Sequence, residues 1–328
     1  MPFLICKLGL RISLITLSEG IVRMATKSPN LLDVSLLVVL IVFWGSSFVV
    51  VKLVLLEGLT PFAIATFRFL VAGALFLLAL LVEKVRNRNY SLKVELRDVS
   101  VLIFLGLTGI TLFFAAQYTG IELAGASIAA ILVCLLSPIL ITSFSAMLFK
   151  ERLVRRQVLG IGVAALGTLA VTVGGALSLQ FNRNFLVGSA IILATPVLWT
   201  AYSLAGKKTI EKYSPFLTVA YVNMLGGIML VPFSLAEGSF TEAFTMSMTG
   251  WLAILYLAVT CSLIGYYIWL RSIKTVGAAI TSSFLFAEPL VTVTLAVTLP
   301  NIREQLTLPI IAGAFLILAG VYLITRRQ

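Results

Sequence analysis

The chain has 328 residues, of which 60% are hydrophobic and only 11% are charged, and its mean hydropathy is +1.10. Soluble globular proteins are about 45–50% apolar and about 25% charged, so this chain has too few polar groups to cover a surface in water. The net charge of +11 would indicate a nucleic-acid partner in a soluble protein, whereas in a membrane protein the positions of the charges set the orientation. We therefore expect an all-α integral membrane protein whose partner is the lipid bilayer, with no nucleic-acid partner.

Histidine is absent, and the three cysteines, Cys6, Cys134 and Cys261, do not have the spacing of metal ligands. The lack of histidine excludes His-based catalytic triads and most catalytic metal sites. An odd number of widely spaced cysteines does not indicate a disulfide framework. We expect no metal and no cofactor.

The first segment, residues 1–33, is expected to be cytoplasmic or to lie at the membrane interface. Its apolar run is interrupted by Lys7, Arg11 and Glu19, which argues against a further span. A signal peptide is disfavoured because the charges lie within the apolar run rather than before it. An alternative is that translation starts at Met24.

Ten windows downstream each contain about 20 mainly apolar residues, the length that crosses a bilayer. They are 34–56, 62–82, 99–119, 125–148, 154–176, 185–205, 215–236, 249–270, 276–299 and 306–325. Most connectors between these windows are short, so consecutive spans are expected to be antiparallel neighbours.

The lysines and arginines alternate between connectors. With the N-terminus in the cytoplasm, the inside segments carry 20 of the 24 positive residues, and the outside connectors carry only Arg183 and Arg303. The other two, Lys52 and Arg68, lie within spans. This distribution follows the positive-inside rule. It predicts a cell-membrane protein with both termini in the cytoplasm.

The second half of the chain repeats the first, in an ordered series of matches offset by 151 to 155 residues. The matched pairs are Trp44 with Trp199, Lys52 with Lys207, Pro61 with Pro215, Gly73 with Gly227, Tyr118 with Trp269, Pro138 with Pro289, Glu151 with Glu304, Gly160 with Gly313, and Gly167 with Gly320. Each repeat, 34–176 and 185–325, holds five spans. Because five is odd, the second repeat enters the membrane with opposite polarity. Inverted repeats are typical of secondary transporters, which bind substrate near the midplane between the repeats.

Three stretches carry a resemblance to a known family: WGSSFVVVKLVLLEGLTPFAIATFRFL (44–70), SPILITSFSAMLFKERLVRRQVLGIGVAALG (137–167) and AEPLVTVTLAVTLPNIREQLTLPIIAGAFLILAGVYL (287–323). They resemble the EamA-type members of the drug/metabolite transporter superfamily. The resemblance covers residues 34–325. It implies a ten-helix exporter or permease of small metabolites.

Glu288 is the acid that the predicted spans place near the midplane, where a charge costs about 2.5–3.5 kcal/mol. We expect it to bind a substrate cation or a proton. The alternative is a structural carboxylate paired with a neighbouring group. Pro289, which has no N–H, is expected to free the carbonyl of Leu285 for other partners.

Two cations also lie within predicted spans. Arg68 could bind a carboxylate or phosphate with its planar guanidinium, or could form an internal ion pair with Glu288. Lys52, like its repeat mate Lys207, is near a span end and is expected to reach the interface with its charged group.

Aromatic and amide side chains recur on four spans and could line a cavity for amphiphilic metabolites by stacking and hydrogen bonding. Alternatively, aromatic residues near span ends anchor the helices at the interface. The cavity candidates are Trp44, Gln117, Tyr118, Trp199, Tyr202, Asn223, Tyr266, Tyr267 and Trp269. Residues expected to serve helix packing or hinges are Pro138, Pro289, Gly160, Gly167, Gly313 and Gly320.

Residues 201–209, AYSLAGKKT, lack the first glycine of a phosphate-binding loop and follow no strand, so no ATP site is expected. Transport would then be passive or coupled to an ion gradient. The prediction is a secondary transporter, with export of amino acids, related metabolites or drugs among the options. Two other classes stay open: a channel or passive facilitator, and an intramembrane enzyme. The enzyme is disfavoured because one midplane glutamate without histidine is a poor catalytic set.

Overall fold

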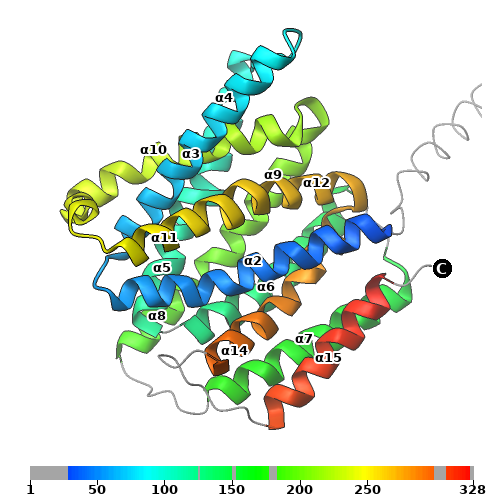
Figure 1. Cartoon of the computed structure of the whole chain (residues 1–328). Helices are drawn as coiled ribbons and strands as arrows, with labels where there is room; N and C mark the ends of the chain where they lie inside the picture. The colour runs from blue at the N-terminus through cyan, green and yellow to red at the C-terminus, as the bar shows by residue number, and fades with distance from the viewer. Residues whose placement is uncertain (1–28, 125, 150–152, 177–182, 299–307, 326–328) are drawn as a thin grey trace, which may run out of the picture.

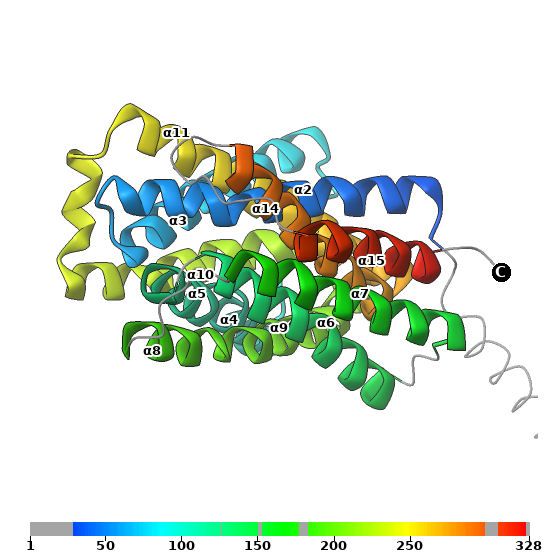
Figure 2. The same ribbon diagram turned by 90° about the horizontal axis from the view of Figure 1, so that it is seen from below.

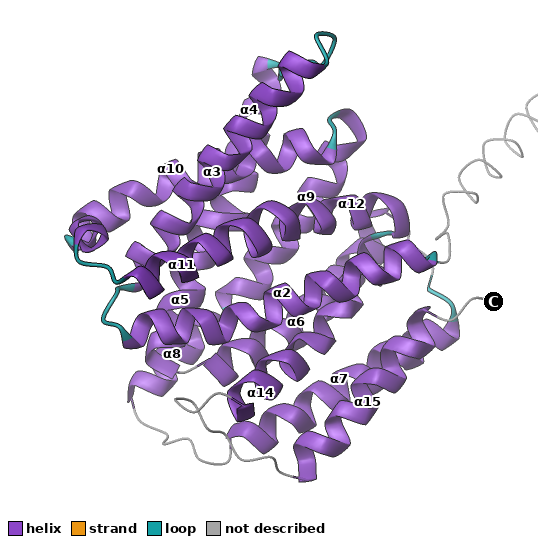
Figure 3. Ribbon diagram, viewed as in Figure 1, coloured by secondary structure: helices purple, strands orange, loops and turns teal. Residues whose placement is uncertain are grey.

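The computed structural model describes residues 29–124, 126–149, 153–176, 183–298 and 308–325. Over these residues the secondary structure is helical, without strands (Figure 3). The predicted N-terminal segment up to residue 28 lies outside the described residues, as does the repeat pair Glu151 and Glu304.

The helices follow the two-repeat order (Figure 1). The first repeat contains α2 (Leu31–Leu56), α3 (Pro61–Arg86), α4 (Leu96–Gly106) continued by η1 (Leu107–Thr111) and α5 (Leu112–Ala124), α6 (Ala126–Phe149) and α7 (Arg155–Ala176). The second contains α8 (Arg183–Ile192) continued by α9 (Ala194–Lys212), α10 (Pro215–Glu237), α11 (Met248–Tyr256) continued by η3 (Leu257–Ile264) and α12 (Gly265–Val276), α13 (Ala278–Ser283) continued by η4 (Phe284–Ala287) and α14 (Glu288–Thr298), and α15 (Leu308–Thr325). A short 3₁₀ helix, η2 (Ser239–Phe244), connects α10 to α11.

If helices that continue one another are counted together, the described elements form ten segments. Eight of these segments are long and apolar enough to cross a membrane. The predicted architecture of ten helices in two five-helix repeats is confirmed.

Matching helices of the two repeats begin in the same way. Pro61 opens α3 after Thr60, whose hydroxyl accepts the Ala63 N–H at 3.3 Å. Pro215 opens α10 after Ser214, whose hydroxyl accepts the Leu217 N–H at 3.2 Å. Proline suits the first helical turn because its missing N–H would have no helical partner there.

The third span of each repeat contains π-helical turns at matching positions, η1 and η3. Such turns disturb the regular carbonyl ladder of a helix and make a carbonyl available to a side chain. The Gly109 carbonyl in η1 accepts the Tyr266 hydroxyl at 2.7 Å. The Cys261 carbonyl in η3 accepts the Trp44 indole N–H at 3.0 Å. Each repeat therefore docks an aromatic side chain onto the π-helical turn of the other repeat.

The ninth span is broken in its middle by the 3₁₀ turn η4, and α14 starts at Glu288. In that turn the Glu288 N–H donates to the Leu285 carbonyl. Pro289 has no N–H to donate to this carbonyl, and the Glu288 N–H in the tighter turn is the partner that takes its place.

Helices α7 and α15 lie side by side along one edge of the bundle (Figures 1 and 2). Their backbones touch at glycines: a Cβ at Gly160 would lie 2.8 Å from the Gly320 carbonyl oxygen, and one at Gly167 would lie 2.7 Å from the Gly313 carbonyl oxygen. Two of the matched glycine pairs thus form the contact between these helices.

The two ends of the bundle are closed differently. At one end Ser247 donates to Glu57 Oε2 at 2.6 Å, which joins the α2–α3 and α10–α11 connections. At the other end Lys212 Nζ lies 2.5 Å from Asp98 Oδ2 and 2.7 Å from Glu95 Oε1, and the Lys212 hydrogen bond lowers the pKa of Glu95. We call these the Glu57 end and the Lys212 end. The Lys212 end carries the connectors that the sequence predicts to be cytoplasmic.

Candidate functional site

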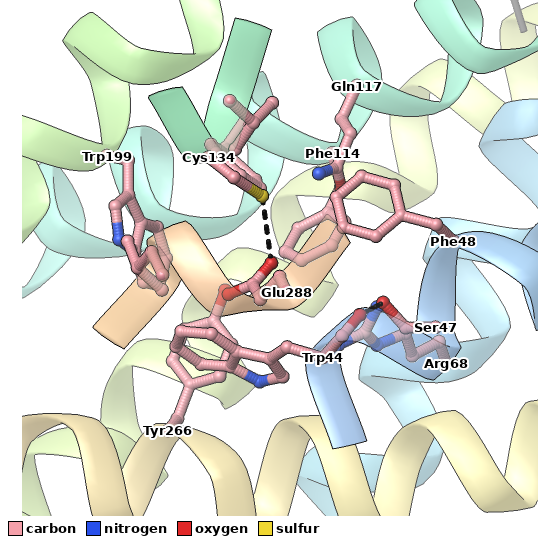
Figure 4. Close-up of a pocket in the computed structure, with 13 residues that line it drawn as sticks. Trp44, Ser47, Phe48, Arg68, Phe114, Gln117, Cys134, Trp199, Tyr266 and Glu288 are labelled. Atoms are coloured by element: carbon pink, nitrogen blue, oxygen red, sulfur yellow. Dashed lines mark hydrogen bonds between the residues drawn. The ribbon is translucent and has the colours of Figure 1, made fainter. Parts of the chain in front are cut away.

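A cavity lies between helices of both repeats (Figure 4). It is lined by Trp44, Ser47 and Phe48 of α2, Arg68 of α3, Phe113, Phe114 and Gln117 of α5, Val133 and Cys134 of α6, Trp199 of α9, Tyr266 of α12, Leu285 of η4 and Glu288 of α14. Six of the twelve residues predicted for substrate binding, coupling or the cavity line it: Trp44, Arg68, Gln117, Trp199, Tyr266 and Glu288.

Arg68 is held in place by neutral hydrogen-bond partners. Its side chain is only 2% exposed, Nε donates to the Ser262 hydroxyl at 2.9 Å, and Nη1 donates to the Tyr118 hydroxyl at 2.5 Å. The guanidinium carbon also lies 4.5 Å from the centre of the Phe114 ring, a cation–π distance. Nη2 has no hydrogen-bond partner among the described residues. Two hydroxyls therefore orient the guanidinium of Arg68, and its Nη2 is available to a ligand.

Glu288 is the first residue of α14. Its side chain lines the same cavity and is 3% exposed. Its Oε2 accepts the Cys134 thiol at 3.2 Å, while Oε1 has no hydrogen-bond partner among the residues that the structure describes. The backbone there is fixed by α2, because Thr292 donates to the Gly45 carbonyl at 2.8 Å and a Cβ on Gly45 would lie 2.7 Å from the Glu288 carbonyl oxygen. Only glycine at position 45 allows α2 to approach this closely.

Arg68 and Glu288 do not pair. The hydrogen bonds of Arg68 go to hydroxyls, that of Glu288 goes to a thiol, and no ion pair joins them within the described structure. The alternative expectation of an internal Arg68–Glu288 ion pair is therefore wrong. The hydroxyl and thiol partners hold each charged group on its own side of the cavity.

Large aromatic rings from both repeats close one side of the cavity. We call Trp44, Trp199, Tyr202, Tyr266 and Trp269 the aromatic cluster. Their ring centres lie close together, for example 5.3 Å between Trp44 and Trp199, and 5.3 Å between Trp199 and Trp269. All five are buried, so the alternative that they anchor helix ends at the interface is wrong for them. Tyr267 is different: it is 37% exposed and does not line the cavity.

The remaining predicted residues lie around the cavity or away from it. Tyr118 acts through Arg68, and Trp269 lies behind Trp44 with its indole N–H on the Ser203 hydroxyl at 3.3 Å. Asn223 is buried on α10 and donates to the Val219 carbonyl of its own helix. Lys52 is partly exposed on α2 and does not line the cavity. Pro138 is buried within α6.

Sequence reasoning missed the partners that orient the two charges. Ser262 lies in a π-helical turn, and Phe114 and Cys134 lie in apolar runs, where nothing local distinguishes them from packing residues. One signal was available: Cys134 precedes Ser137, the repeat mate of Glu288, by one helical turn. Among the described residues, no group of three or more acidic, cysteine or histidine side chains could hold a metal ion.

The fold and cavity define a multi-pass membrane transporter built from two repeats, and comparison with known proteins gives its family. The model of the EamA-like transporter family matches residues 32–173 and 186–326. The chain belongs to this family, within the drug/metabolite transporter superfamily.

Individual relatives agree with this assignment. The chain is 26% identical over 288 residues to an "Uncharacterized transporter" of Archaeoglobus fulgidus, covering 88% of this chain and 96% of the relative. It is 29% identical over 300 residues to a "Probable amino-acid metabolite efflux pump" of Salmonella typhimurium, covering 89% and 94%. A protein of known crystal structure has the same fold, with a TM-score of 0.71 at 21% identity, over 90% of this chain and 96% of its own.

Proposed function

We propose that this protein is a secondary transporter of small zwitterionic metabolites of the amino-acid type, working by alternating access. One observation carries the proposal: a buried cation, Arg68, and a buried acid, Glu288, line one cavity without pairing. Buried charges in a membrane protein are costly unless they are paired. A ligand that brings one charge of each sign would compensate both.

The free atoms suit such a ligand. A substrate carboxylate would accept from Nη2 of Arg68, while Ser262 and Tyr118 hold the rest of the guanidinium. A substrate ammonium would donate to Oε1 of Glu288, which has no other partner. The apolar part of the substrate would pack on Trp44 and the neighbouring rings of the aromatic cluster.

The direction and orientation belong to the same proposal. Relatives in Salmonella typhimurium and Escherichia coli carry the name "Probable amino-acid metabolite efflux pump", which supports export. The positive connectors at the Lys212 end support a cytoplasmic location for that end and for both termini. The cavity would then collect its substrate from the cytoplasm when the aromatic cluster opens.

Glu288 is also the proposed coupling group. A carboxyl buried without a cation can stay protonated until a substrate ammonium arrives, and it would then release its proton. This exchange would link export to the proton gradient without ATP.

Substrate counterflow in proteoliposomes tests the proposal against its alternatives. A carrier accumulates labelled amino acid transiently against an excess of unlabelled amino acid inside, with saturation, whereas a channel or passive pore does not. Recovery of the solute chemically unchanged, checked by mass spectrometry, distinguishes transport from an intramembrane enzyme. Absence of counterflow for every zwitterionic amino acid tested would contradict the proposal.

A further inference from the structure

Several buried hydroxyl groups have no hydrogen-bond partner within the part of the chain that the structure describes. They belong to Ser137, Thr142 and Ser145 of α6, Tyr202 of α9 and Ser272 of α12. Each of these side chains is at most 8% exposed. Nearby hydroxyls on the same helices do have partners, as Thr200 donates to the Pro196 carbonyl at 2.6 Å. Because buried polar groups in folded proteins are nearly always bonded, a group of unpaired ones requires a physical reason.

Two of the α6 hydroxyls, those of Ser137 and Ser145, lie on one buried helix face that starts at the cavity. Cys134, Ser137, Ile141 and Ser145 are spaced by three or four residues and are all buried, so they lie above one another on α6. Cys134 lines the cavity and contacts Glu288. Ser145 lies about one turn before the end of α6. The face therefore leads from the substrate cavity toward one end of the bundle.

That end is the Lys212 end. The ring of Phe149, the last residue of α6, lies 4.2 Å from Nζ of Lys207, which is near the end of α9. Helix α6 packs against α9 and α13, and α12 packs against the same two helices. Tyr202 and Ser272 therefore lie on helices that surround the same interior space as the α6 face.

The rings of the aromatic cluster form two layers next to the cavity. Trp44, Trp199 and Tyr266 line the cavity, whereas Tyr202 and Trp269 pack behind them. Ser272 follows Trp269 by three residues, one turn closer to the Lys212 end. Ser272 thus lies beyond the rings that line the cavity, and the Tyr202 hydroxyl belongs to a ring that packs behind them.

We infer that these five hydroxyls line the second half of the substrate route, which is closed in this conformation and opens to water at the Lys212 end. In the open conformation they bind water and the polar groups of the passing substrate, which satisfies them. The unpaired hydroxyls raise the free energy of the closed conformation. This keeps the two conformations close in stability. This inference rests on the proposed alternating access. It names the residues that line the half of the substrate route that is closed in this conformation.

Cysteine accessibility tests the inference. Ser137→Cys and Ser145→Cys change one atom each, and Thr168→Cys is the matched control: Thr168 of α7 is equally buried, but its hydroxyl is bonded to the Ala164 and Phe286 carbonyls. The probe is a membrane-impermeant cationic methanethiosulfonate applied to inside-out and right-side-out vesicles. Labelling is followed peptide by peptide, so that native Cys134 and Cys261 serve as internal references in every variant.

We expect Ser145→Cys and Ser137→Cys to react on the order of tenfold faster than Thr168→Cys in inside-out vesicles, because their side chains are wetted when the route opens. Rates equal to that of Thr168→Cys from both sides would overturn the inference. Counterflow in the same preparations is measured separately. Loss of counterflow with normal labelling would count against the proposed function alone.

A second variant distinguishes a functional hydroxyl from a packing flaw. Ser145→Ala removes the unpaired group from the closed state, so we expect a higher melting temperature together with a counterflow rate lowered by roughly fivefold. Thr168→Val, which removes a bonded hydroxyl, is expected to lower the melting temperature without this slowing. A higher melting temperature of Ser145→Ala with an unchanged transport rate would overturn the inference.

Discussion

Arg68 and Glu288 line the same cavity and do not pair: Arg68 donates to the hydroxyls of Ser262 and Tyr118, and Glu288 accepts the thiol of Cys134. In the interior of a membrane protein, opposite charges ordinarily satisfy each other. Here the hydroxyl and thiol partners are neutral, so none of them compensates the charge of Arg68. This arrangement is the basis of the proposal that one ligand bridges the two groups.

Replacing Arg68 by lysine tests the anion half of the site. Arg68→Lys keeps the charge but cannot hold the Ser262 and Tyr118 hydroxyls and also present a planar edge to a carboxylate. We expect the KM for carboxylate-bearing substrates to rise about tenfold or more in counterflow assays. Arg86→Lys, an exposed position on the same helix, serves as the control and should leave KM unchanged. An unaltered KM in Arg68→Lys would show that no carboxylate meets this fork.

Replacing Glu288 by glutamine tests the coupling. Glu288→Gln keeps the shape and an oxygen for the Cys134 thiol, but it removes the titration. We expect pH-driven accumulation to be lost, while exchange without a gradient continues because it requires binding and conformational change but no proton release. Glu122→Gln, at an exposed position on α5, is the control. Undiminished pH-driven transport by a well-expressed Glu288→Gln protein would rule out coupling through this residue.

The contact between α7 and α15 predicts a sharp difference between two glycines of one helix. A Cβ at Gly160 would lie 2.8 Å from the Gly320 carbonyl oxygen, whereas a Cβ at Gly162 would meet no atom within 4 Å. We expect Gly160→Ala to destabilise the protein by about 1–3 kcal/mol, because two backbones must separate. Gly162→Ala should be neutral or stabilising by about 0.5–1 kcal/mol. Thermal unfolding in detergent measures both, and similar effects of the two changes would contradict the close approach.

The orientation in the membrane can be tested at two connectors. Gly58 and Gly238 have positive φ and tolerate substitution poorly, so the exposed Thr241 is the better position at the Glu57 end. We expect Thr241→Cys to be labelled by an impermeant maleimide in intact cells. Asn89→Cys, at the Lys212 end, should be labelled only after permeabilisation. Labelling of Asn89→Cys in intact cells would reverse the proposed orientation.

Much of the fold could be predicted from the sequence because membrane spans are determined by apolar length. The window 34–56 became α2, Leu31–Leu56, and the window 62–82 became α3, Pro61–Arg86. The π-helical turns of η1 and η3 were not predicted, since neither segment contains a proline or a local pattern that differs from regular helix. They follow from tertiary hydrogen bonds with Tyr266 and Trp44, which a single-helix pattern does not contain.

The two charges of the site could be predicted, but their partners could not. Arg68 and Glu288 stand out because a charge within a span needs a reason. Ser262 and Cys134 are ordinary in apolar helices, and their roles depend on how the inverted repeats cross. The same crossing decides that Arg68 bonds to Tyr118 rather than to Glu288, which the sequence left open.

Ligand binding by the purified protein tests the central claim most directly, namely that one substrate bridges Arg68 and Glu288. Thermal stabilisation is measured for three matched ligands: a zwitterionic aromatic amino acid, its carboxamide, which lacks the carboxylate, and its N-acetyl form, which lacks the ammonium. We expect the zwitterion to stabilise the parent protein most. We also expect Arg68→Lys to lose the preference over the carboxamide only, and Glu288→Gln to lose the preference over the N-acetyl form only. Equal stabilisation by all three ligands, or the same change of preference in both variants, would contradict the bridging site.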